Sequence, residues 1–202
     1  MNTTNAASLL PLLLFVVIAT VSPGGATALA TASGAQFGFR RSIPLIIGIA
    51  IGLGSLAAAS AAGLAGLFLA LPSFQLILKA VGSLYLLWLA WNIMRSGKPN
   101  LDAKKEKPIS VVAGILLLWL NPKGWTMTLG AAASFAALAS TPGKLAALLG
   151  ASFGISALLS LSIWCTAGLM LARLLRTEMH WRVTNVILGL LLAASIIPIW
   201  MD

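Results

Sequence analysis

Long apolar runs separated by short polar breaks dominate this chain of 202 residues. The runs are continuous, whereas the strands of a membrane barrel would alternate apolar and polar residues with a period of two. About 20 apolar residues in helical form are needed to cross a hydrocarbon core about 30 Å thick. The pattern therefore predicts an all-α, polytopic membrane protein with six transmembrane helices, at residues 9–37, 43–71, 73–94, 109–138, 145–171 and 183–200.

The composition agrees with lipid as the solvent of this chain. Hydrophobic residues make up 59% of it and charged residues only 8%, which is too apolar for a water-soluble domain of this length. The net charge of +9 is compatible with a nucleic-acid partner, but the basic residues are scattered among the spans and do not form one face. Membrane topology explains them better, so we expect a lipid bilayer and no nucleic acid as partner.

The basic residues are strongly biased to one side of the predicted membrane. The opposite side has only Lys144, in the fourth link. The positive-inside rule then places both termini on the periplasmic or extracellular side of a bacterial inner membrane. The first, third and fifth links carry Arg40, Arg41, Arg95, Lys98, Lys104, Lys105, Lys107, Arg173, Arg176 and Arg182.

The first apolar run is also compatible with a secretory signal peptide. Residues 9–21 are followed by Ala28-Leu29-Ala30, which has the small residues of a cleavage site. No Lys or Arg precedes the run, however, and a signal peptide begins with a basic region. We therefore expect an uncleaved first helix, and a mature protein beginning at Thr31 would contradict this.

Two clusters of helix-breaking residues fall inside predicted spans. Ser22-Pro23-Gly24-Gly25 interrupts the first span, and Asn121-Pro122-Lys123-Gly124 interrupts the fourth. Proline removes a helix donor, and glycine tolerates the backbone conformations needed to restart a helix. The freed backbone groups cannot face lipid, so they must face protein or a wet cavity.

The two interruptions suggest an inverted repeat. Three helices in residues 1–96 precede a polar cytoplasmic loop at 97–108, and three follow in residues 109–202. Because each half has an odd number of helices, the second half crosses in the opposite sense, as in transporters whose site lies between two repeats. Alternatively, proline kinks and small-residue faces serve only helix packing. The matching glycines are Gly48 and Gly52 with Gly150 and Gly154, and Gly82 with Gly189.

Several motifs resemble those of the LysE/RhtB superfamily of amino-acid exporters over nearly the whole chain. They are Ser22-Pro23-Gly24, similar to that family's (S/T)PGP element, residues 34–41 with Gly48 and Gly52, residues 79–86, and Leu120-Asn121-Pro122-Lys123. The resemblance implies a six-helix inverted-repeat fold and efflux of amino acids or related metabolites. Gly25, Ala26 and Thr27 depart from the pattern, which weakens the transfer of any particular substrate.

The predicted spans contain no carboxylate, but two of them contain a lysine, Lys79 in the third span and Lys123 in the fourth. Asp102, Glu106, Glu178 and Asp202 all lie in links or at the chain end. An intramembrane acid is the usual partner of a cationic substrate, so its absence favours neutral or weakly acidic amino acids over lysine or arginine. Lys123 lies beside the second interruption, either as a functional charge or as a side chain that snorkels to an interface.

We therefore predict a substrate site at the two interruptions. Lys123 and the N–H groups after Pro23 and Pro122 would hold the substrate carboxylate, because helix N-termini carry partial positive charge. Freed carbonyl groups and Asn121 would take its ammonium group. For Tyr85, an interhelical hydrogen bond is an equal alternative. The predicted site comprises Pro23, Gly24, Gly25, Gln36, Tyr85, Asn121, Pro122, Lys123 and Trp125.

Catalysis has little support in this sequence. The chain has one Cys, one His and no acid within a span, and it has no GxGxxG, P-loop or CxxC motif. These features predict no enzyme, no cofactor and no metal site, with an enzyme acting on lipid as the less favoured alternative. A non-catalytic membrane subunit is the main alternative to a transporter of small molecules, and the GxxxG faces leave a homo-oligomer open.

Overall fold

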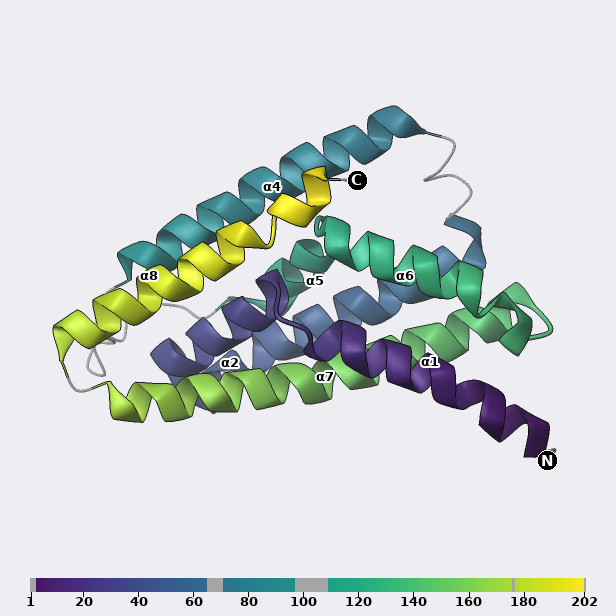
Figure 1. The fold of residues 1–202 in the computed structure, drawn as a ribbon, viewed down its shortest axis with the longest axis horizontal. Coiled ribbons are helices and arrows are strands. Elements are labelled where there is room, and N and C mark those ends of the chain that lie inside the picture. Colours follow the sequence, from purple (N-terminus) through teal and green to yellow (C-terminus); the bar gives the residue numbers. More distant parts are fainter. Residues whose placement is uncertain (1–2, 65–70, 97–108, 176, 202) are drawn as a thin grey trace.

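A computed structural model of the chain describes residues 3–64, 71–96, 109–175 and 177–201, and all regular secondary structure in these ranges is helical (Figure 1). The predicted all-α class is therefore confirmed. The predicted loop at 97–108 and the end of the second predicted span lie outside the described residues. The elements are α1 (Thr3–Val21), α2 (Gly25–Ala59), η1 (Ser60–Leu64), α4 (Pro72–Arg95), α5 (Val111–Trp119), α6 (Pro122–Ser134), η2 (Ala136–Leu138), α7 (Pro142–Leu174), α8 (Glu178–Ala194) and η3 (Ile197–Trp200).

Both predicted interruptions are present. The first separates α1, which ends at Val21, from α2, which begins at Gly25. The second separates α5, which ends at Trp119, from α6, which begins at Pro122. Pro122 occupies the first turn of α6, where a missing N–H has no cost because that donor would have no intrahelical acceptor.

Helix α2 reverses direction at Gly38. This glycine has φ 75° and ψ 170°, a conformation that residues with a Cβ rarely adopt. The hydroxyl oxygens of Ser33 and Ser42 lie 2.7 Å apart, although nine residues of straight helix would separate them by about 13.5 Å. The part of α2 before Gly38 thus completes the first predicted span, and the part after it forms the second.

Three helical stretches are long and apolar enough to cross a membrane, namely Gly25–Gly63, Leu76–Arg95 and Pro142–Leu174. The ranges predicted as the first, fourth and sixth spans contain shorter helices. These are α1 in the first range, α5 and α6 in the fourth, and α8 in the sixth.

The sixth predicted span begins earlier and ends earlier than the sequence suggested. Helix α8 starts at Glu178 because the Thr177 hydroxyl accepts a hydrogen bond from the His180 backbone N–H at 3.2 Å. Trp181 is buried and anchors this first turn. The helix ends at Ala194, and the short helix η3 follows.

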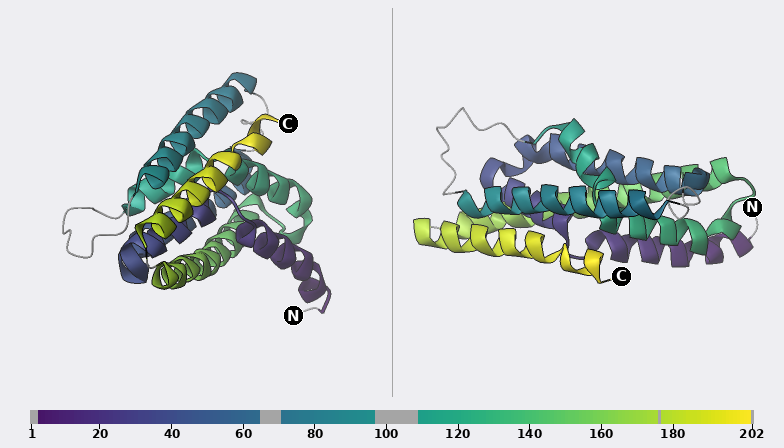
Figure 2. Two further views of the ribbon diagram at one scale, coloured as in Figure 1. Left: turned by 60° about the vertical axis from the view of Figure 1, so that its left-hand side comes forward. Right: turned by 90° about the horizontal axis from the view of Figure 1, so that it is seen from above.

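Helices α2 and α7 form the most extensive helix–helix contact among the described residues. Helices α1 and α5 pack against this pair, while α4 and α8 lie side by side along another flank (Figures 1 and 2). Small residues allow α2 and α7 to approach closely. A Cβ on Gly34 would overlap the backbone carbonyl of Cys165, and a Cβ on Gly168 would overlap that of Thr31.

The other glycines singled out in the sequence also lie at close backbone contacts. Gly48 faces Val111 of α5, and a Cβ there would overlap the Val111 carbonyl oxygen. Gly150 of α7 instead packs on α2, near the carbonyl oxygen of Gly54. Gly82 of α4 is pressed against the Leu120 carbonyl, immediately before the second interruption. These contacts support the interpretation that the glycines allow neighbouring helices to pack closely.

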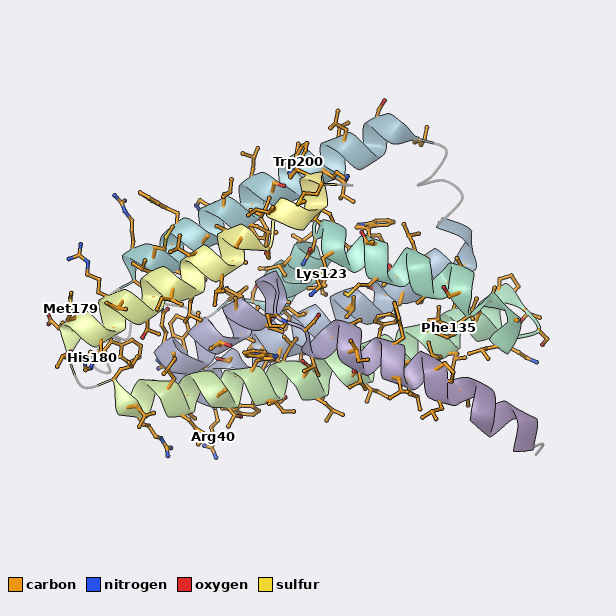
Figure 3. All side chains as sticks on the ribbon, in the orientation of Figure 1. Arg40, Lys123, Phe135, Met179, His180 and Trp200 are labelled. Atoms are coloured by element: carbon orange, nitrogen blue, oxygen red, sulfur yellow. The ribbon has the colours of Figure 1, made fainter. Side chains whose placement is uncertain are left out.

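Several of the described arginines lie at one end of the bundle. Arg40 lies at this end together with His180 (Figure 3). The C-terminal ends of α4 and α7, which carry Arg95 and Arg173, lie at the same end (Figure 1). Lys144 lies in the first turn of α7, at the opposite end. The arrangement agrees with the distribution of charge that the sequence analysis assigned to alternate links.

We predict that Gly168→Ala destabilises the bundle by about 1–3 kcal/mol, because the added Cβ forces α2 and α7 apart. Thermal unfolding of the purified protein in detergent would measure the loss as a lower midpoint. Gly143→Ala in the same helix is the control, since a Cβ at Gly143 meets no atom within 4 Å. An unchanged midpoint for Gly168→Ala would contradict the packing described here.

Candidate functional site

A small cavity lies where the two interrupted segments meet. It is enclosed by the end of α1, the start of α2, the α5–α6 junction and the middle of α7. Its volume is about 40 Å³, which gives room for about three water molecules or a small polar group. Its lining residues are Ala19, Thr20, Ser22, Gly24, Gly25, Ala26, Thr27, Ile49, Leu53, Leu118, Asn121, Lys123, Gly124, Met127, Ala157 and Leu161.

Lys123 is the only charged residue among those that line the cavity. Its ammonium group donates hydrogen bonds to three oxygens of the first interruption. The Nζ atom lies 3.0 Å from Ser22 Oγ, 3.3 Å from the Pro23 carbonyl oxygen and 3.5 Å from the Ser22 carbonyl oxygen. These oxygens follow the C-terminus of α1, where the helix dipole favours a positive charge. Lys123 therefore ties one interruption to the other, and Figure 3 shows it at the centre of the bundle.

Two residues of α7 bind the carbonyl groups that precede those bound by Lys123. Ser160 Oγ donates to the Thr20 carbonyl oxygen at 2.9 Å, and Trp164 Nε1 donates to the Val21 carbonyl oxygen at 3.2 Å. One turn earlier in α7, the Ser156 hydroxyl lies 2.7 Å from the Thr20 hydroxyl. Side chains from other helices thus satisfy the last carbonyl groups of α1, which have no intrahelical donors.

These contacts from α7 were not predicted from the sequence. Ser156, Ser160 and Trp164 recur at every fourth position, a spacing that places polar groups on one face of a helix. This periodicity within an apolar run was a usable signal for a polar contact with a neighbouring helix.

The start of α2 presents backbone donors to the cavity. The Gly24 N–H donates to Thr27 Oγ1 at 2.8 Å, and the same hydroxyl donates back to the Gly24 carbonyl oxygen at 2.9 Å. In the first turn that follows, the N–H groups of Gly25, Ala26 and Thr27 have no intrahelical acceptors. The Thr27 hydroxyl caps the Gly24 N–H, but Gly24 itself has no side chain that could accept from these three N–H groups. The N-terminus of α2 is therefore open to an anionic group.

The start of α6 differs, because its donors are already used. Asn121 Oδ1 accepts from the Lys123 backbone N–H at 3.0 Å. The Asn121 carbonyl oxygen accepts from the N–H groups of Gly124 at 2.9 Å and Trp125 at 3.3 Å. Pro122 has no N–H group. Of the two helix starts in the predicted site, only that of α2 retains free donors.

Several predicted site residues lie together at the cavity. Gly24, Gly25, Asn121 and Lys123 line it, and Pro23 contributes a carbonyl group to the ammonium group of Lys123. Pro122 is buried at the start of α6 and is not among the lining residues.

Three other predicted site residues lie elsewhere in the bundle. Tyr85 of α4 stacks on Trp88, with ring centroids 5.9 Å apart. Trp125 donates to the Trp119 carbonyl oxygen at 2.8 Å and packs against Trp119. Because it follows Lys123 by two residues, Trp125 faces about 200° away from it around the helix. Gln36 lies near the reversal of α2, and its buried Nε2 atom has no hydrogen-bond partner among the described residues.

A helical membrane protein whose interrupted helices meet at a small cavity that holds a lysine has the architecture of a secondary transporter. This chain belongs to the LysE type translocator family, because the sequence model of that family matches residues 17–194. The matched range contains both interruptions and every residue that lines the cavity. The predicted resemblance is therefore confirmed, and the protein is a membrane transporter, not an enzyme.

Similar proteins are known from enteric bacteria. A cysteine/O-acetylserine efflux protein of Escherichia coli (strain K12) is 29% identical over 192 residues, which cover 92% of this chain and 94% of that protein. A protein of the same name from Klebsiella pneumoniae is 32% identical over 112 residues, 55% of this chain and 56% of that protein. No solved structure matches this chain significantly.

The hydrogen bond between Lys123 and Ser22 predicts energetic coupling between the two side chains. Ser22→Ala and Lys123→Met should each lower the free energy of unfolding. The double variant should lose about 1–2 kcal/mol less than the sum of both losses, because either change removes the same charged hydrogen bond. Thermal unfolding of the four proteins in detergent would measure this coupling.

A second lysine–serine pair provides a matched control. Lys144 Nζ lies 3.3 Å from Ser140 Oγ, and both residues are exposed at the end of the bundle. The corresponding cycle with Ser140→Ala and Lys144→Met should give coupling close to zero, because solvent replaces the bond. Equal coupling in the two cycles would show that the Lys123 contact has no special role.

Proposed function

We propose that this protein exports amino acids, neutral or weakly acidic rather than cationic, across the bacterial inner membrane. The observation that carries the proposal is the cavity between the two interruptions, where a lysine ammonium group, free backbone donors and carbonyl groups face one small space. A zwitterion needs both kinds of partner within a few ångströms of each other.

The substrate carboxylate would bind at the start of α2. The N–H groups of Gly25 and Ala26 are donors at the positive end of a helix, and the Lys123 ammonium group is within reach because it lies beside Gly24. A Cβ placed on Gly24 would lie 3.0 Å from Lys123 Nζ. The absence of a side chain at Gly24 therefore leaves space for both the lysine and a carboxylate.

The substrate ammonium group would bind at the end of α1. The Ser22 and Pro23 carbonyl oxygens, together with Ser22 Oγ, form the acceptors of this subsite. Ile49, Leu53 and Leu161 form apolar walls for a substrate side chain. The small volume and the absence of an acid among the lining residues favour small neutral amino acids.

The similar proteins support this substrate class by their names. Both are named for the efflux of cysteine and O-acetylserine, which are small amino acids without a cationic side chain. The departure at Gly25, Ala26 and Thr27 falls on the very turn that would bind the carboxylate, which is common to all amino acids. Among the small amino acids, a different preference is therefore expected to arise at the apolar walls and not at this turn.

We further propose an inverted repeat of two three-helix halves with both termini outside the cytoplasm. The basic end of the bundle, with Arg40 and Arg173, would face the cytoplasm, as the positive-inside rule requires. Each half contributes one interruption to the cavity, so relative movement of the halves would expose the cavity to alternate sides.

Lys123→Met should lower the export rate at least about tenfold, because it removes a charged partner of the substrate. The assay is efflux of labelled L-serine, L-cysteine, L-glutamate and L-lysine from proteoliposomes that contain the purified protein. Efflux of serine and cysteine, but not of lysine, is expected for the wild type. Lys144→Met is the control and should transport normally. Full export by a folded Lys123→Met protein would contradict the proposed site.

The orientation can be tested by labelling single cysteines in intact cells. In a Cys165→Ala background, Gly143→Cys and Met179→Cys each place a thiol at an exposed position, at opposite ends of the bundle. A membrane-impermeant maleimide should label position 143 in intact cells and position 179 only after permeabilisation. The reverse pattern would overturn the proposed topology.

A further inference from the structure

The ammonium group of Lys123 occupies the position that the substrate ammonium group would need. Its three acceptors, Ser22 Oγ and the carbonyl oxygens of Ser22 and Pro23, lie 3.0 to 3.5 Å from Nζ. These are the same oxygens that the proposed function assigns to the substrate ammonium group. In the structure, the lysine thus fills that subsite with a cation of identical chemistry.

Two ammonium groups cannot share this set of oxygens. At a separation of a few ångströms like charges repel strongly, and the effect is larger in a half-buried site than in water. The cavity of about 40 Å³ offers little space for a second cation beside Lys123. No acid lines the cavity to neutralise the excess charge.

No other charged side chain lines the cavity. The described parts of α1 and α5 carry no charged residue, and Lys123 is the only one of α6. The basic residues of α2 and α7 lie in their end turns or at the reversal of α2, away from the cavity. The thiol of α7, Cys165, packs against Gly34 and does not line the cavity.

We propose that Lys123 makes a carboxylate obligatory in the substrate, an inference that rests on the proposed function. In the empty transporter its ammonium group fills the ammonium subsite. A zwitterion releases it by offering a carboxylate at the start of α2, and the flexible lysine side chain moves from the α1 oxygens to that carboxylate. An amine without a carboxylate offers no such exchange, so Lys123 excludes it.

The structure supplies the path for this exchange. Nζ lies beside Gly24, the residue between the Ser22 and Pro23 carbonyl groups and the first free donors of α2. The transfer therefore needs rotation of the lysine side chain and no new opening of the backbone. It also releases the link between α1 and α6, so substrate binding would free one interruption from the other.

The test compares each amino acid with its decarboxylated amine. Binding of L-cysteine against cysteamine, and of L-serine against ethanolamine, is measured with the purified full-length protein in detergent by calorimetry. The wild type should bind each amino acid more tightly than its amine. Lys123→Met should reduce that affinity ratio at least tenfold, because the vacant oxygens accept an amine while the carboxylate loses a partner.

Matched variants separate charge from folding. Lys123→Arg keeps the positive charge and should retain a preference for the amino acid, and Lys144→Met should keep the wild-type ratio. If Lys123→Met fails to fold, Lys123→Gln replaces it, since it retains an N–H donor for the same oxygens without the charge. The same fall in the ratio is expected.

The outcomes distinguish a failure of this inference from a failure of the proposed function. A wild-type protein that binds none of the four ligands overturns the proposed function and this inference with it. A wild type that binds the amino acids but shows no preference over the amines overturns the inference alone. The inference is also overturned if a folded variant without the Lys123 charge keeps the wild-type affinity ratio of amino acid to amine, or binds neither the amino acids nor the amines.

Discussion

The structure depends on finding hydrogen-bond partners for backbone groups that an apolar surrounding cannot satisfy. The carbonyl groups of Thr20, Val21, Ser22 and Pro23 all accept hydrogen bonds from side chains of α6 or α7. A buried carbonyl without a donor costs several kcal/mol in hydrocarbon. The interruption of the first span is therefore stable only if side chains of α7 and Lys123 donate hydrogen bonds to these carbonyl groups. This requirement constrains the positions of the helices around the cavity.

Glycines set the distances on which those contacts depend. Gly34 and Gly168 bring the first part of α2 against α7, and this pairing also holds the end of α1 within reach of Ser160 and Trp164. Gly82 likewise allows α4 to pack closely against the Leu120 carbonyl group, beside the second interruption. Close packing of small residues is the general source of helix association in lipid. Here it also positions the polar site.

The two interruptions look equivalent in sequence but have different chemistry. At the start of α6, Asn121 accepts from the available N–H groups, whereas the start of α2 keeps its donors free. The end of α1 is negative in character and the start of α2 is positive, and both face one cavity. Under the proposed function, this asymmetry would give a zwitterionic substrate one favoured orientation, with its carboxylate at the start of α2 and its ammonium group at the end of α1.

The sequence by itself determined the helical class, the family resemblance, the two interruptions and four of the residues that line the cavity, Gly24, Gly25, Asn121 and Lys123. Apolar run length, proline and glycine act locally, so they can be read along the chain. Only the tertiary structure decided that α7 binds the α1 carbonyl groups, that Trp125 and Tyr85 do not line the cavity, and that Lys123 rests on oxygens about 100 residues distant. Those facts depend on how each helix is rotated about its axis and on which helices meet, and side-chain packing across the whole bundle sets both.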